Sequence, residues 1–162
     1  MGNYNNFEPD FVSRTIDLIE QYYAMIEQLE VPFEKQFNYT LTLNCLLGLI
    51  VMPKEREIRC VPNTRLTADF KNEMGLNRSI LPDSQTTLRR LIEMMRHSVA
   101  HFDIEVESTD EHNLVNFVNF KDTASKEVYA RFSSDEILPF LKFYAERLVE
   151  NIHQKQQYRE LA

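Results

Sequence analysis

The chain has 162 residues and a formal net charge of −7, from 18 Lys and Arg against 25 Asp and Glu. With 43% hydrophobic residues and only 3 Gly and 6 Pro, it is too apolar to be disordered and too poor in glycine for a fibrous repeat. The length is typical of one folding unit, so we expect a single domain over residues 1–162.

The short apolar runs and the small number of cysteines indicate the cellular location of the protein. The longest run, Leu46 to Met52, is far shorter than the ~18–20 residues of a membrane span, and the first residues lack the pattern of a secretory signal. Cys45 and Cys60 are too few for a disulfide scaffold or a cysteine zinc cage. We therefore expect a cytoplasmic protein with free thiols and no membrane association.

Helical spacing dominates the first hundred residues. A first helix is predicted to end near Val31-Pro32, and a second to cover about 33–52 with an apolar centre. Leu66 to Met74 predicts a short helix, and Asp83 or Ser84 is a suitable N-cap for a third long one. The predicted core face of that third helix contains Leu88, Leu91, Ile92, Met95, Val99 and Phe102.

The period changes after residue 102. Alternation over 104–107, 114–120 and 127–132 predicts three short strands. Ser133 and Glu136 have the spacing of a capping box for a last helix. The sequence therefore predicts a mainly α fold, a four-helix up-down bundle with a small β-hairpin or meander between the third and fourth helices.

Basic residues are concentrated in the middle of an acidic chain. From Lys54 to Arg96 there are nine basic and six acidic residues. A local positive region can bind phosphates even on an acidic protein, because screening limits the reach of each charge to ~8–10 Å. Lys54, Arg56 and Arg59 could line an RNA path, and an ordinary solvated loop is the alternative.

The segment from Arg96 to His101 is the most informative for chemistry. His97 and His101 are four residues apart, which places them ~40° apart on the polar face of the third helix. Arg96 lies ~140° from His101, so one straight helix does not bring these two side chains together. A second copy of the helix across a two-fold axis would do so.

Three interpretations of this segment compete. The histidines could be a metal pair, but Ser98 follows His97 where a zinc HExxH motif has glutamate. They could simply interact with the last carbonyls of the helix. Alternatively, arginine and histidine could form a phosphodiesterase site without metal, in which arginine binds phosphate and histidine transfers protons. That chemistry requires RNA, because DNA lacks the 2′-hydroxyl nucleophile.

This segment resembles the signature of the HEPN superfamily, in which an arginine, four to six intervening residues and a histidine lie near the end of a bundle helix. Here Arg96 matches the arginine, His97 its polar neighbour and His101 the terminal histidine. The long apolar second helix ending at Leu49–Glu55 and the strands before Phe132-Ser133 are similar to a plasmid and bacterial branch of this superfamily.

The resemblance implies a homodimer in which both motifs meet at an interface cleft. It also implies a metal-independent endoribonuclease without cofactors that leaves a 2′,3′-cyclic phosphate and a 5′-hydroxyl, often as a toxin with an antitoxin partner or as a phage-defence effector. Catalysis is then expected from Arg96 and His101 with help from His97, and Ser98 could contact RNA beside them.

Two positions depart from the family pattern. His97 replaces the commoner asparagine, and Asp103 stands where one branch has a tyrosine that a partner nucleotidyltransferase modifies. Some superfamily members lack catalysis altogether. The alternative function is therefore a non-catalytic dimeric module that binds RNA or protein, which the net charge of −7 favours.

Overall fold

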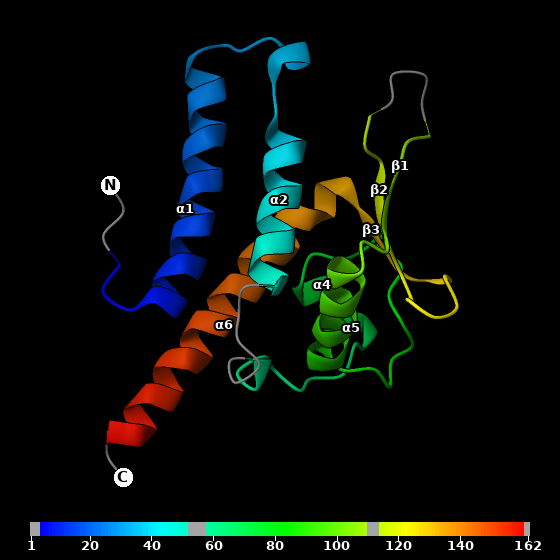
Figure 1. Ribbon diagram of the computed structural model, residues 1–162. Helices are drawn as coiled ribbons and strands as arrows, with labels where there is room; N and C mark the ends of the chain where they lie inside the picture. Colours follow the sequence, from blue (N-terminus) through cyan, green and yellow to red (C-terminus); the bar gives the residue numbers. More distant parts are fainter. Residues whose placement is uncertain (1–3, 52–57, 110–113, 161–162) are drawn as a thin grey trace.

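The structure is a computed structural model that describes residues 4–51, 58–109 and 114–160. Two long helices, α1 (Phe7–Gln28) and α2 (Asn38–Val51), lie side by side and are joined through a 3₁₀ turn at Phe33–Lys35. The last helix, α6 (Ile137–Glu160), runs obliquely and packs against both of them (Figure 1). No helix in these described ranges is long and apolar enough to cross a membrane.

The helix that carries the candidate motif, α5 (Leu88–Ala100), packs against α2 and follows the short α4 (Ala68–Glu73). Its N-cap is Thr87, whose hydroxyl accepts from the Arg90 amide at 3.3 Å. The prediction of Asp83 or Ser84 as the cap was wrong. The Asp83 carboxylate instead closes the preceding turn by accepting from the Gln85 and Thr86 amides, and the helix begins only after that turn.

A three-stranded antiparallel sheet lies between α5 and α6 in the chain. Its strands β1 (Ile104–Glu107), β2 (Phe117–Lys121) and β3 (Val128–Ser133) are in the order β1-β2-β3. Asn119 in β2 pairs with Glu105 on one side and Arg131 on the other. The prediction of a mainly helical protein with a small meander between the third and fourth long helices is confirmed.

One hydrophobic core joins the helices to the inner face of the sheet. Phe120 and Phe132 from the strands continue into Phe140 and Tyr144 of α6, with successive ring centroids 5.7, 5.2 and 6.2 Å apart. All four rings are buried. Cys45 and Cys60 are free thiols buried within this core, and burial raises the pKa of Cys45.

The predicted capping box at the start of α6 was wrong. The Ser133 hydroxyl donates to the Asp135 carboxylate at 2.6 Å instead of capping the helix. The buried Glu136 carboxylate accepts from the amides of residues 77, 78 and 79 at 2.8–2.9 Å and from the Ser79 hydroxyl at 2.7 Å. Glu136 therefore stabilises a distant loop, because that loop presents three amide donors that need a buried acceptor.

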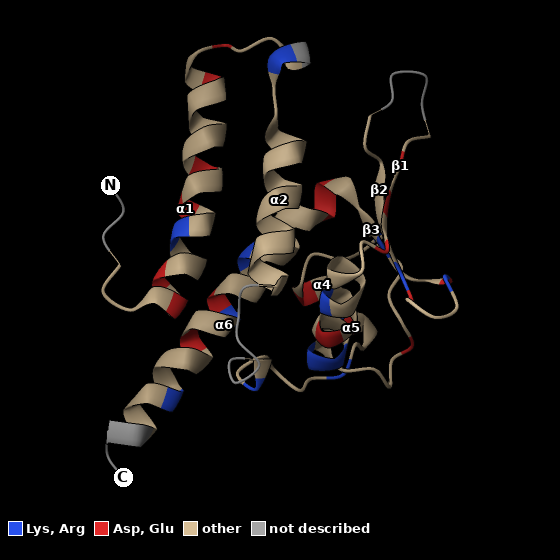
Figure 2. Ribbon diagram, in the orientation of Figure 1, with Lys and Arg blue, Asp and Glu red and all other residues tan. Residues whose placement is uncertain are grey.

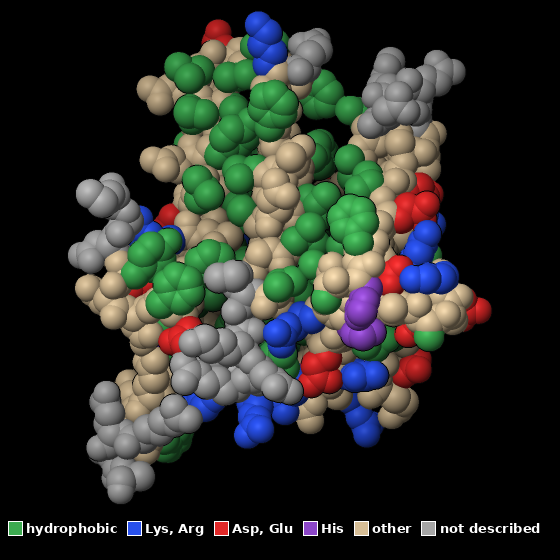
Figure 3. Space-filling view, viewed as in Figure 1, with side chains coloured by type: hydrophobic (Ala, Val, Ile, Leu, Met, Phe, Trp, Pro, Cys, Tyr) green, Lys and Arg blue, Asp and Glu red, His purple; other side chains and the backbone are tan. Residues whose placement is uncertain are grey.

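Many exposed apolar side chains belong to α1 and the segment that joins it to α2. Leu29 and Phe37 are each 65% exposed, and Figure 3 shows apolar side chains (green) gathered over α1 and α2. Tyr39 and Val51 of α2 are exposed, but α5 contributes no large exposed apolar residue between Leu88 and Ala100.

Candidate active site

The last turn of α5 brings the two predicted histidines together. Their ring centroids are 4.5 Å apart, and the planes meet at 61°. Both side chains are exposed, and the His101 amide donates to the His97 carbonyl at 3.1 Å. Figure 3 shows histidine side chains (purple) over α5 with basic side chains (blue) on either side. Two adjacent, solvent-accessible imidazoles can accept and donate protons in one reaction.

Arg96 lines a hollow of about 610 Å³ between α5 and the segment that begins at Ile58. Arg59, Arg89 and His97 line the same hollow, and Glu93 is its one acidic lining residue among those described. His101 is not among the lining residues. Basic residues recur on α5 and the neighbouring segment, as Figure 2 shows in blue. The hollow is therefore suited to an anion such as a phosphate.

Hydrogen bonds from the Arg89 side chain to backbone carbonyls keep Arg59 at the edge of this hollow. The Arg89 guanidinium donates to the Val61 carbonyl at 3.0 and 2.9 Å and to the Arg59 carbonyl at 3.1 Å. Arg59 itself is exposed. The two other predicted RNA contacts after α2, Lys54 and Arg56, lie outside the described residues.

Ser98 is part of the core and does not face the hollow. It is 1% exposed, and its hydroxyl lies 3.2 Å from the Met94 carbonyl, 2.8 Å from the Lys121 carbonyl and 2.8 Å from the Tyr129 hydroxyl. Burial, opposed by the Ser98 hydrogen bond, raises the pKa of Tyr129 to about 12. Ser98 thus links the last turn of α5 to the sheet, and its burial does not favour the predicted contact with RNA.

We expect Ser98→Ala to destabilise the fold, because it leaves buried hydrogen-bonding groups on Lys121 and Tyr129 without their shared partner. The expected loss is about 1–2 kcal/mol, seen in thermal denaturation as a Tm lower by about 3–6 °C. Ser84→Ala, at an exposed position before α5, is the matched control and should leave the Tm unchanged. Equal melting of the two variants would contradict this role for Ser98.

His97 stands between two hollows. Besides the one shared with Arg96, it lines a hollow of 430 Å³ together with Arg90, Ser98, Asp122 and Tyr129. Hydrogen bonds from the amides of residues 125 and 124 lower the pKa of Asp122. The hollow beside Arg96 has three arginines against Glu93, whereas the second hollow has Arg90 against Glu93 and Asp122. This difference in charge favours a bound phosphate on the Arg96 side.

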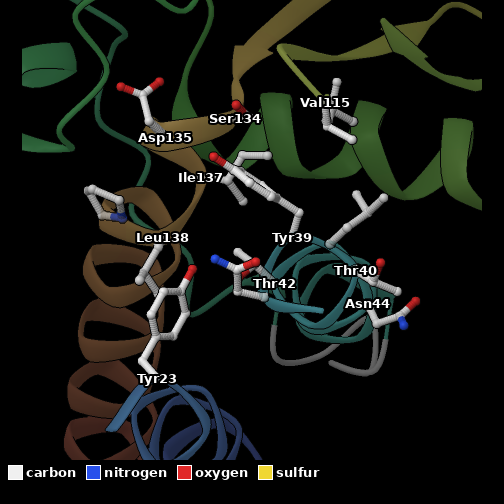
Figure 4. A pocket seen from close by; sticks show the side chains of 14 residues that line it. Tyr23, Tyr39, Thr40, Thr42, Asn44, Val115, Ser134, Asp135, Ile137 and Leu138 are labelled. Carbon is white, nitrogen blue, oxygen red and sulfur yellow. The ribbon is translucent and has the colours of Figure 1, made fainter. Parts of the chain in front are cut away.

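A separate apolar pocket of 470 Å³ lies at the other end of α2 (Figure 4). Tyr39 and Thr42 of α2 face Tyr23 of α1 and Leu138 of α6 across it. Its lining contains none of the predicted site residues, and it has no basic side chain. The pocket therefore offers nothing to a phosphate.

The residues described in the structure include no group of three or more His, Cys, Asp or Glu that could hold a metal ion. The mainly helical fold with a small antiparallel sheet is consistent with a HEPN domain. A family model described as HEPN pEK499 p136 matches residues 1–155, and the chain belongs to this family. Comparisons with curated proteins and with solved structures give no match.

Proposed function

We propose that the protein is a metal-independent endoribonuclease in which Arg96, His101 and His97 act at the end of α5. The observation that supports this most is the pair of exposed imidazoles 4.5 Å apart, next to an arginine-lined hollow. Membership of a HEPN family adds to this, because many HEPN domains are ribonucleases.

In the proposed reaction, the RNA 2′-hydroxyl attacks the adjacent phosphorus and its proton passes to an imidazole. The Arg96 guanidinium stabilises the negative charge that builds up on the phosphoryl oxygens. The P–O5′ bond then breaks, and an imidazolium protonates the departing 5′-oxygen. One product chain ends in a 2′,3′-cyclic phosphate and the other begins with a 5′-hydroxyl. His101 is the principal proton-transfer group, and the neighbouring His97 assists it.

HEPN domains often dimerise, and a homodimer is part of this proposal. Arg96 lines a hollow that His101 does not reach within one chain, so a two-fold partner that supplies the missing group completes the site. Pairing two sets of basic residues also offsets the charge of −7, which otherwise opposes RNA binding. A toxin or phage-defence role, with an antitoxin protein as the partner, fits such an activity.

The test is cleavage of a pool of structured RNAs in the presence of EDTA. Wild-type protein should produce cyclic-phosphate ends, and His101→Ala should reduce the rate by about 10²–10⁴-fold, the usual contribution of a general acid or base. Equal cleavage by both proteins would mean contamination. If clean protein at dimer-forming concentrations binds RNA without cleaving it, the protein is instead a non-catalytic binding module.

A further inference from the structure

Phe102 ends α5 in a conformation that usually requires glycine. Its φ is +58°, while its amide donates to the Val99 carbonyl at 3.1 Å and the Asp103 amide donates to the Ser98 carbonyl at 2.7 Å. These two hydrogen bonds define a Schellman motif, in which the left-handed position is most often glycine. For other residues the left-handed region is strained.

Burial of the Phe102 side chain does not offset this backbone strain. The side chain is 87% exposed, although the sequence placed it on the core face of α5. That prediction was wrong, because the helix ends at Ala100 and the reversal at Phe102 turns the ring away from the core. Glu30 and Lys126 also have positive φ, but their polar side chains are well solvated. Phe102 alone of the three combines backbone strain with an exposed aromatic ring.

The surroundings of Phe102 suit a nucleotide. It directly follows His101, whose ring packs against His97, and on its other side Asp103 forms an ion pair with Lys126 at 2.6 Å. An exposed aromatic ring beside histidines and a lysine can stack on any base, because every base has a π-face.

We propose that Phe102 is the stacking platform for an unpaired base next to the scissile phosphate, so that the substrate is single-stranded or looped RNA. This inference rests on the proposed function for the position of the phosphate. Consecutive residues are only ~3.8 Å apart along the backbone, so a base on Phe102 places its own sugar and phosphate beside His101. Bases within a duplex are already stacked on their neighbours and cannot use this ring.

The test compares Phe102→Gly and Phe102→Trp with wild type, using a single-stranded RNA that contains 2-aminopurine and a fully paired duplex of the same length. Phe102→Gly should bind the single strand about tenfold more weakly and show less change in 2-aminopurine fluorescence. Phe102→Trp should retain the binding of the single strand and the change in 2-aminopurine fluorescence. Relief of backbone strain should also raise the Tm of Phe102→Gly by about 2–4 °C.

Glu30→Gly is the matched control, because Glu30 occupies the same position in a Schellman motif at the end of α1, where the Val31 amide donates to the Ile26 carbonyl at 3.0 Å. It should raise the Tm similarly and leave RNA binding unchanged. Unaltered single-strand binding by Phe102→Gly would overturn the proposal, as would loss of the dimer in this variant, which would make Phe102 a contact between copies.

The two proposals can fail separately. Cleavage that requires Arg96 and His101 but not Phe102 would retain the nuclease and refute the stacking platform. Phe102-dependent binding of single strands without cleavage would retain the platform and refute the nuclease. A wild-type protein that binds neither RNA would refute both.

Discussion

Arg96→Ala is expected to lower RNA cleavage by about 10²–10³-fold, because the guanidinium would no longer stabilise charge on the phosphoryl oxygens in the transition state. The measurement is the initial rate of cleavage of one RNA in EDTA by the variant and by wild type. Arg147→Ala is the matched control, since Arg147 is an exposed arginine on α6 that pairs with Glu73 at 2.9 Å and lines neither hollow beside His97.

Mixing two inactive variants tests whether the site is shared between copies. If Arg96 of one copy acts with His101 of the other, a heterodimer of Arg96→Ala and His101→Ala keeps one intact site and one doubly defective site. Random exchange of subunits then restores about a quarter of wild-type activity, because about half the dimers are mixed and each has one working site of two. No recovery after verified exchange would place both residues in one chain.

Glu136→Gln is expected to destabilise the fold by about 2–3 kcal/mol, because a buried carboxylate that accepts several hydrogen bonds is replaced by an amide. The glutamine nitrogen cannot accept from the Ser79 amide and hydroxyl, which bond Glu136 at 2.9 and 2.7 Å. Thermal denaturation near neutral pH should show a Tm lower by roughly 5–10 °C. Glu146→Gln, at an exposed position on α6, is the control.

The effect of Glu136→Gln should depend on pH. Burial by itself would raise the pKa of Glu136, but hydrogen bonds from the Ser79 hydroxyl and the amides of residues 77–79 outweigh it and lower the pKa below 4.5. The ionised carboxylate therefore stabilises the fold above pH 4.5, and this contribution is lost as the pH falls through the lowered pKa. The stability difference between wild type and variant should shrink there. A difference independent of pH would contradict this account.

The helices and strands could be predicted because their patterns are local. Periods of 3.6 and 2 identified α1, α2, α5, α6 and all three strands. The helix caps were harder to predict from the sequence, because several polar residues compete at each helix end and tertiary contacts decide between them. Glu136 has the right spacing for a local cap with Ser133, but its hydrogen-bond donors lie 57–59 positions earlier in the chain.

In the candidate site, too, only the features encoded by a local sequence pattern could be predicted. The spacing of His97 and His101 was sufficient to place their rings together, because both are on one helix face. The convergence of Arg59 with Arg96 depends on how Arg89 holds another segment, which no local pattern encodes. The burial of Ser98 did leave a signal: it follows Leu91 and Met95 at intervals of four and three, which is the core face of α5.

The long reach of Glu136 has a consequence for the order of folding. The loop before α5 obtains its acceptor from a residue up to 59 positions later, and contacts of such separation form late because loop closure costs entropy first. On the ribosome, the support of α5 is incomplete until α6 has begun to emerge. The end of α5 that carries His97 and His101 therefore reaches its final setting only after the residues around Glu136 have been made.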